Sequence, residues 1–254
     1  MSASYQPTKV LYDQSADRWV RGEPTSLSDF TARPVVLGMC EPIAGQKILD
    51  LGCGEGYCSR ELARRGAAEI YAMDLSEGMI QAAQRQDEID RWGIQYAVGC
   101  ATDLSHLDNA AFDVVLAVFL FNYLTVEQMQ QCMAEVFRVL RPSGRFIFSV
   151  PHPAFPYMRA ADYPFYFEVN GAGYFSQQDR QFPGRIWKRD GSWLDVQLIH
   201  KPLESYFETL AKAGFQSMPT LRELRVTPEH VQLDPNFFQP LVDYPLHLAI
   251  QVWR

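Results

Sequence analysis

The sequence predicts an α/β fold built on a doubly wound, seven-stranded and mostly parallel sheet. Between residues 46 and 150, short apolar strand patterns alternate with helix patterns, which is typical of parallel strands covered by helices. The run 112–119 is almost continuously apolar between polar loops, as expected for a central strand buried on both faces. A glycine-rich turn at 52–56 joins the first strand to the helix that follows.

The first half of this core contains three predicted strands, at 47–51, 69–74 and 94–98. A helix is expected over 57–65, because an amphipathic pattern stops at Gly66, a residue suited to the left-handed end of a helix. Ser76 is the predicted N-cap of the next helix, since its hydroxyl can accept a backbone hydrogen bond there. These elements give a regular strand-helix alternation.

The second half begins with the strand at 112–119 and a capping box formed by Thr125 and Gln128. The break at 141–144 is followed by a fifth strand at 145–150. The helix opened by the capping box carries one apolar stripe, which predicts core packing rather than ligand binding. The stripe consists of Met129, Cys132, Met133, Val136, Phe137 and Leu140.

Periodicity is lost between residues 151 and 193, a stretch rich in aromatic residues. A long irregular segment in a compact domain is commonly functional, so we interpret it as a lid or cap inserted after strand five. Regular patterns return as a strand at 194–200, a helix at 202–213 and a final strand at 244–253.

Composition excludes several classes of protein. The net charge is −7 and no Lys/Arg run occurs, which argues against nucleic-acid partners and anionic membrane surfaces. Residues 1–15 are polar, and the longest apolar run, 114–121, is far shorter than a bilayer span. The five cysteines form no C-x-x-C pair, which fits free thiols in a reducing compartment and no metal site. We expect a cytoplasmic monomer or homodimer.

The most informative segment is the turn after the first strand, which reads Asp50-x-Gly52-x-Gly54-x-Gly56. Strand, glycine turn and helix N-terminus together form a crevice for a nucleotide. A dinucleotide fingerprint, G-x-G-x-x-G, would need its third glycine at position 57, which is a tyrosine. Cys53 fits the turn as a small residue rather than as a nucleophile.

This spacing resembles motif I of the class I S-adenosylmethionine (SAM) methyltransferases, which have a Rossmann-like sheet. The resemblance covers residues 10–150 and 198–253 but not the lid. It implies that the turn binds the methionine end of SAM and that Asp50 meets the ammonium group, directly or through water. Asp50 could equally brace the turn by accepting backbone hydrogen bonds. The turn residues concerned are Gly52, Cys53, Gly54 and Gly56.

The ends of strands two and three carry further candidate residues. Asp74, followed by Leu75, can accept both ribose hydroxyls, although an acid at this distance is also typical of NAD-binding proteins. The segment Thr102-Asp103-Leu104 resembles the adenine-recognition segment of the family, which implies a hydrogen bond from the adenine amino group to Asp103. The alternative for Asp103 is a turn or N-cap residue.

The segment 117–123 resembles motif IV, whose residues flank the methyl group and the acceptor. Val118 and Phe119 would contact the cofactor. Many relatives end this motif with a His-His pair, whereas this chain has Asn122-Tyr123. Both residues are therefore catalytic candidates whose roles stay open.

His152, between two prolines after strand five, could be a general base for an acceptor hydroxyl or a hydrogen-bonded hinge residue. The segment from Tyr12 resembles a Tyr-Asp-x-x-Ala leader that forms a helix over the cofactor, with its tyrosine facing the active site. Trp19 and Val20 replace the second tyrosine and acid of that leader. The remaining histidines are expected to be surface or packing residues: His106, His200, His230 and His247.

These observations predict four parts: an N-terminal helical cover (1–45), the SAM-binding core (46–150), the lid (151–193) and the C-terminal part of the core sheet (194–254). The implied function is methyl transfer from SAM to a small, apolar or aromatic acceptor, on O, N or C, leaving S-adenosyl-L-homocysteine. Lids that vary with substrate suggest secondary metabolism. In-line displacement needs alignment and exclusion of water more than a conventional catalytic residue.

Other interpretations remain. Aromatic walls could clasp a cation, and the lid arginines leave an acidic acceptor open. A non-catalytic SAM-binding module would also keep the pocket, and only the Asn122-Tyr123 departure favours it. A nicotinamide oxidoreductase is disfavoured by Tyr57 and by Asp103. Macromolecular methylation is disfavoured because neither a basic groove nor a recognition domain is evident.

Overall fold

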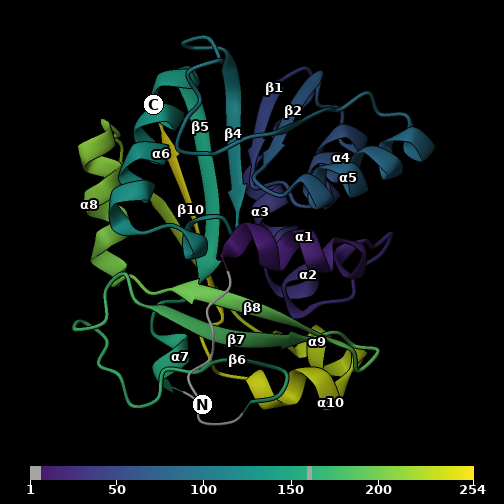
Figure 1. The fold of residues 1–254 in the computed structure, drawn as a ribbon, viewed down its shortest axis with the longest axis vertical. Helices are drawn as coiled ribbons and strands as arrows, with labels where there is room; N and C mark the ends of the chain where they lie inside the picture. Colours follow the sequence, from purple (N-terminus) through teal and green to yellow (C-terminus); the bar gives the residue numbers. More distant parts are fainter. Residues whose placement is uncertain (1–6, 159–161) are drawn as a thin grey trace.

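The computed structural model describes residues 7–158 and 162–254. Its main feature is a seven-stranded sheet in the order β3-β2-β1-β4-β5-β10-β9 (Figure 1). Five strands are parallel, and β10 runs antiparallel between β5 and β9. The strands are β1 (Lys47–Leu51), β2 (Glu69–Asp74), β3 (Gln95–Val98), β4 (Phe112–Val118), β5 (Leu140–Pro151), β9 (Thr220–Leu224) and β10 (His247–Trp253). This confirms the predicted α/β, Rossmann-like fold.

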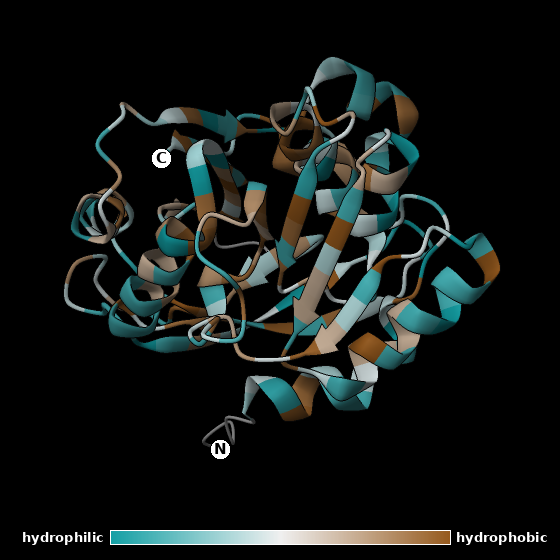
Figure 2. Ribbon diagram, turned by 90° about the horizontal axis from the view of Figure 1, so that it is seen from above, coloured by the Kyte–Doolittle hydropathy of each residue, from teal (hydrophilic) through white to brown (hydrophobic). Residues whose placement is uncertain are grey.

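Helices cover both faces of this sheet (Figure 2). One face packs against α6 and α8, through buried residues such as Met133 and Tyr206. The other face packs against α3 and α4, through residues such as Val36 and Leu62. The helices of this part are α1 (Thr8–Trp19), α2 (Leu27–Thr31), α3 (Arg33–Met39), α4 (Tyr57–Arg64), α5 (Glu77–Asp90), η1 (Phe121–Tyr123), α6 (Val126–Val139) and α8 (Leu203–Ala213).

The predicted helix boundaries have identifiable local causes. The Ser76 hydroxyl accepts from the Met79 backbone N–H at 3.1 Å and so caps α5. Thr125 and Gln128 form the capping box of α6, with reciprocal hydrogen bonds of 3.0 and 3.2 Å. Gly214, with φ of 111°, ends α8 in the left-handed conformation that a side chain would disfavour. The predicted cap of Ser76 and the predicted capping box are confirmed, and α8 ends at Ala213, where the helix predicted at 202–213 ends.

A second, antiparallel sheet lies against the carboxyl ends of the parallel strands (Figure 1). It consists of β6 (Phe165–Phe167), β7 (Gln181–Trp187) and β8 (Trp193–Ile199). Its apolar side buries a cluster of its own, to which residues such as Phe237 and Leu241 contribute from later in the chain. The short helices here are α7 (Phe155–Met158), α9 (Pro228–Leu233), α10 (Pro235–Phe238) and η2 (Gln239–Leu241). We call the described residues of 155–199, together with residues 225–246, the cap.

The C-terminal third differs from the prediction. The strand expected at 194–200 forms as β8, but it pairs with β7 in the cap and not within the main sheet. The seventh core strand is β9. No apolar pattern predicts it, because it is an edge strand in which only Leu224 is buried. The segment 151–193 also contains two strands rather than an irregular loop. In addition, β5 begins at Leu140, so the expected break at 141–144 lies inside that strand.

No helix in the described ranges is both long and apolar enough to cross a membrane.

Candidate functional site

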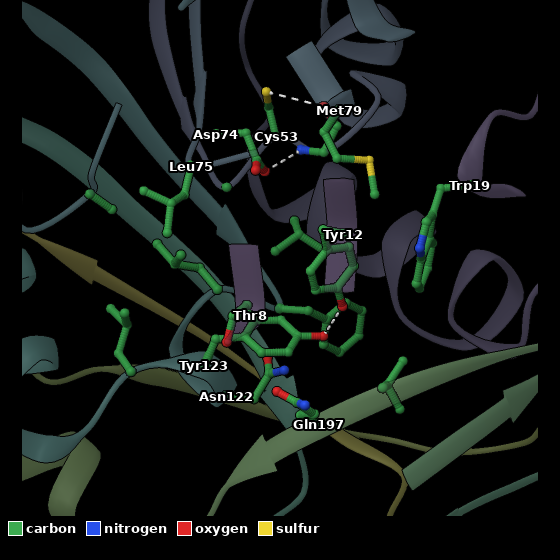
Figure 3. Close-up of a pocket in the computed structure, with 18 of the residues that line it drawn as sticks. Thr8, Tyr12, Trp19, Cys53, Asp74, Leu75, Met79, Asn122, Tyr123 and Gln197 are labelled. Atoms are coloured by element: carbon green, nitrogen blue, oxygen red, sulfur yellow. Dashed lines mark hydrogen bonds between the residues drawn. The ribbon is translucent and has the colours of Figure 1, made fainter. Parts of the chain in front are cut away.

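A cavity of about 430 Å³ separates the carboxyl ends of the core strands from the cap. Its core half is formed by the glycine turn, the end of β2, residues 99–102 and the end of β4. Its other half is formed by cap residues of β6, β7 and β8, and α1 borders it (Figure 3). The aromatic and apolar side chains from the cap are Phe165, Phe167, Ile186 and Val196.

Hydrogen bonds join the start of the glycine turn to β2, whereas the middle of the turn, at Gly54, faces open space. The backbone N–H groups of Gly52 and Cys53 both donate to the carbonyl of Met73, at 2.8 and 3.0 Å. Gly54 has φ of 56°, and a Cβ atom there would point into open space, so its backbone is accessible to a ligand in the cavity. Burial raises the pKa of Cys53 well above its usual value, which keeps this residue a thiol.

Gly56 has a different role from the other turn glycines. It lies outside the cavity lining, and a Cβ atom would come within 2.5 Å of the Tyr96 hydroxyl. Its φ of 82° sets the start of α4. The predicted cofactor contact of Gly56 is therefore replaced by a packing role.

Asp74 lines the cavity at the end of β2 in a fixed orientation. One carboxylate oxygen accepts from the Gly54 backbone N–H and the other from that of Ser76, both at 2.9 Å (Figure 3). Burial raises the pKa of Asp74. A carboxylate has about four acceptor positions, so these two bonds leave capacity for ligand hydroxyls. Leu75 follows at the cavity edge.

Asp50 lies at the end of β1, with 1% of its surface exposed. Its carboxylate accepts from the Ser59 hydroxyl at 2.6 Å, so it is held by α4 rather than by backbone N–H groups of the turn. Burial raises the pKa of Asp50 to about 7, and the nearby charge of Asp74 acts in the same direction. Asp50 also lines the cavity.

The segment after β3 contributes less than predicted. Thr102 lines the cavity, together with Gly99, Cys100 and Ala101. Asp103 is exposed and accepts from Ser105, and these hydrogen bonds lower its pKa. Leu104 is buried in the core. The structure therefore places Asp103 in a turn and Leu104 in the core, and neither reaches the cavity lining.

The end of β4 enters the cavity as predicted. Val118 and Phe119 line it, and Phe119 has φ of 58°, which is uncommon for a bulky residue and turns the chain off the strand. Asn122 and Tyr123 follow in η1 and also line the cavity. Asn122 is 3% exposed, and its Oδ1 atom has no hydrogen-bond partner among the described residues.

Tyr12 and Tyr123 face each other across the cavity (Figure 3). Their hydroxyls share a hydrogen bond, and their rings lie edge to face with centroids 5.4 Å apart. Burial raises the pKa of both phenols, so both are protonated at neutral pH. The predicted N-terminal helix with an inward tyrosine is thus found in α1.

Asp13, the next residue of α1, fixes this helix against the core. Its carboxylate accepts from the Ser76 hydroxyl at 2.6 Å and from the Gly78 backbone N–H at 3.1 Å. Gly78 allows the close approach, since a Cβ atom there would meet the Asp13 carbonyl at 3.1 Å. The helix therefore lies beside the Asp74 end of the cavity.

His152 lies outside the cavity lining. Its Nδ1 atom accepts from the Ala154 backbone N–H at 3.2 Å, and Nε2 lies 3.2 Å from a carboxylate oxygen of Glu223. Burial lowers its pKa. These contacts match the hinge role, and the general-base role predicted for His152 is not supported.

Sequence reasoning missed several cavity residues. Arg33 donates through Nη1 to Asp29 at 2.8 Å, and its guanidinium lies 5.5 Å from the ring centre of Phe119. Arg21 forms ion pairs with Asp29 and Glu55 at 3.2 and 3.0 Å. Both arginines come from the segment 20–45, which has no motif, and only the fold brings them to the glycine turn. The other missed residues of the lining include Gln197 and His247.

Comparisons with known proteins agree with this geometry. Residues 48–144 match the family model described as a methyltransferase domain. A demethylmenaquinone methyltransferase of Clavibacter sepedonicus is 32% identical over 154 residues, which is 59% of each chain. An S-adenosylmethionine dependent methyltransferase from Mesorhizobium loti superimposes with a TM-score of 0.63 at 22% identity, covering 87% of this chain and 96% of its own. A Listeria monocytogenes protein proposed to be such an enzyme gives a TM-score of 0.63 at 27% identity, covering 87% and 97%.

The fold is that of the SAM-dependent methyltransferases to which the chain is similar, and residues 48–144 match a methyltransferase domain. It spans between 53% and 59% of the length of two curated relatives that it matches.

Proposed function

We propose that this protein binds SAM and catalyses methyl transfer to a small, neutral acceptor with an apolar or aromatic body. The observation that carries the proposal is the division of one cavity into two chemically different halves. The core half presents carboxylates and glycine backbone, and the cap half presents aromatic and aliphatic side chains.

The core half fits the groups of SAM. Asp74 has free acceptor capacity for the two ribose hydroxyls. The open side of Gly54 allows the methionine chain to approach the backbone, where Asp50 would meet the ammonium group. Arg33 would meet the carboxylate of SAM. Of its three guanidinium nitrogens, only Nη1 has a hydrogen-bond partner among the described residues, so the others can bind a ligand. Residues 99–102 would line the adenine.

When bound, SAM supplies a methyl group on a positively charged sulfur, so that transfer is an in-line displacement. The residues of this chain then have to hold the acceptor in line and exclude water. Phe119, Asn122 and Tyr123 line the cavity after the end of β4. The Tyr12–Tyr123 hydrogen bond connects α1 to η1 beside the cavity.

The cap half favours a neutral acceptor. Two of its arginines are paired with carboxylates: Arg185 with Asp195 at 2.9 Å, and Arg189 with Asp234 at 3.2 Å. Neither lines the cavity, and the carboxylates that do line it belong to the core half. An acidic acceptor bound by the lid arginines and a cationic acceptor are both less well supported than an uncharged aromatic one.

The test is a calorimetric titration with SAM, followed by incubation with methyl-labelled SAM and a panel of small aromatic compounds. Saturable binding of SAM, no response to NADH and formation of S-adenosylhomocysteine with an acceptor would support the proposal. Binding of SAM without product from any acceptor would favour the non-catalytic SAM-binding module instead. NADH binding with no response to SAM would overturn both.

A further inference from the structure

His247 is the first residue of β10, at the meeting point of core and cap. It pairs with Pro151 at the end of β5 and with Leu224 at the end of β9. Because β10 runs antiparallel to its neighbours, its first residue lies at the edge where the parallel strands end. The side chain lines the cavity there.

Two aromatic rings from different layers pack against the imidazole. The ring of Phe119, from the end of β4, lies edge-on with its centroid 5.0 Å from that of His247. The ring of Phe165, from the cap strand β6, has its centroid 5.7 Å away. The imidazole is therefore held between one aromatic ring of the core and one of the cap.

The polar atoms of this imidazole have no partner within the described part of the chain. His247 is 3% exposed, and its Nδ1 atom is buried without a hydrogen bond. No hydrogen bond to Nε2 is formed by the described residues either. A buried polar atom without a partner is uncommon and costs roughly 1–3 kcal/mol. Nε2, which also has no partner among the described residues, is not one of the buried unpartnered atoms, so it is the nitrogen that a ligand in the cavity can reach.

The surroundings of His247 keep it uncharged. Burial lowers its pKa to about 3, and the nearby Arg33 and His152 act in the same direction. A neutral imidazole offers one donor and one acceptor nitrogen. Aromatic walls with a single neutral donor-acceptor group match an aromatic ring that carries a hydroxyl, because a hydroxyl can both donate and accept. The positive charge of Arg33 disfavours an ammonium group at the same place.

We propose that His247 binds the methyl acceptor by a hydrogen bond and that the acceptor is a neutral hydroxylated aromatic compound. This inference rests on the proposed methyltransferase function for the identity of the ligand as the acceptor. The hydrogen bond selects and orients the ligand, and no proton transfer to the imidazole is required.

The experiment compares para-cresol with toluene, two probes that differ by one hydroxyl. Binding to the protein loaded with S-adenosylhomocysteine is measured by calorimetry or by ligand-observed NMR. We expect the wild-type protein to bind para-cresol about 5- to 10-fold more tightly than toluene, as one well-placed hydrogen bond would give. Each binding measurement is repeated without the nucleoside, so failure of nucleoside binding does not prevent the comparison.

The informative variant is His247→Phe, which keeps an aromatic ring between Phe119 and Phe165. It should abolish the preference for para-cresol and leave S-adenosylhomocysteine affinity unchanged. His247→Asn, which restores a hydrogen-bonding group, should recover part of the preference. His106→Phe is the matched control, because His106 is exposed and lies outside the cavity lining.

An equal preference for para-cresol in wild type and His247→Phe would overturn the inference and leave the methyltransferase proposal intact. Absence of para-cresol binding up to its solubility limit would also overturn it. Should His247→Phe not fold, ¹⁵N shifts of the histidine rings in the wild type decide: para-cresol must move the His247 signals and toluene must not. If the wild-type protein does not bind S-adenosylhomocysteine, the result contradicts the proposed function instead.

Discussion

The two halves of the cavity are constructed in different ways. In the core half, Asp74 is the last residue of β2, and Gly54 and Thr102 lie a few residues beyond the ends of β1 and β3, so a short local pattern places the side chain or backbone group. In the cap half, Phe165 and Val196 come from β6 and β8, and His247 of the main sheet packs against Phe165. Local sequence therefore encodes the core half, whereas tertiary packing assembles the cap half.

The largest expected effect is in the core half. Gly54→Val places a β-branched side chain at φ of 56° and directs its Cβ atom into the open middle of the turn. We expect SAM binding to weaken by about 100-fold or more, since the side chain occupies the path of the ligand and strains the turn. Calorimetric titration measures the loss.

Gly191→Val is the matched control for this substitution. Gly191 also has a positive φ, 85°, and open space around its Cβ position, but it lies outside the cavity lining. It should lower stability while leaving SAM affinity as in the wild type. Equal loss of SAM binding in both variants would attribute the effect to folding rather than to the turn.

Asp74→Asn should weaken SAM binding by roughly 10- to 100-fold, because an amide cannot accept from both backbone N–H groups and the ribose at once. Asp103→Asn should change SAM affinity little, because this exposed carboxylate lies outside the lining. The pair of titrations separates strand-end acids that face the cavity from those that do not. A larger loss for Asp103 than for Asp74 would reverse the assignment of the adenine and ribose sides.

The raised pKa of Asp50 predicts a pH dependence. Only its ionised form attracts the ammonium group of SAM, so affinity should fall as the pH decreases through about 7. The ligand-free protein should show the opposite trend in stability, because a buried carboxyl with a raised pKa contributes stability at low pH that is lost as pH rises through about 7. Arg33, which lowers the pKa of Asp50, and Asp74, which raises it, are the charged groups acting on it.

Asp50→Asn tests this directly. The variant should bind SAM more weakly at pH 8 and should lose the change of affinity between pH 6 and pH 8, a range of about one unit on either side of the Asp50 pKa. An unchanged pH profile in the variant would assign the dependence to another group.

The smallest effect is expected at the boundary between the halves. His152→Ala removes a hydrogen bond to an exposed carboxylate at a site outside the cavity, so turnover and SAM affinity should stay within about 2-fold of the wild type. Melting temperature should fall slightly. A drop in turnover of two orders of magnitude at unchanged SAM affinity would restore the general-base role.

The sequence predicts the parallel strands of the core well because buried central strands have apolar runs and their helices have recognisable caps. It does not reveal β9. This strand lies at the edge of the sheet, and four of its five residues are exposed, so it has no apolar run. It gives the residues of β8 correctly as a strand but assigns them to the wrong sheet, since strand patterns carry no information on pairing partners.

The same limit applies to the site. Asp74 and Gly54 are predictable because a turn pattern fixes their place, whereas Arg33 and His247 have no distinguishing neighbours in the sequence. His152 has a suggestive position next to the cap, but its ring nitrogens are both engaged by hydrogen bonds that no sequence pattern shows.

The cap is closed by chain segments that leave the core and return to it twice, at 155–199 and again at 225–246. Transplanting the cap between enzymes, to exchange acceptor preference, therefore requires two fragments rather than one. A graft limited to 151–193 would leave β8 behind without its partner β7 and would separate Val226, Phe237 and Leu241 from the cluster they complete.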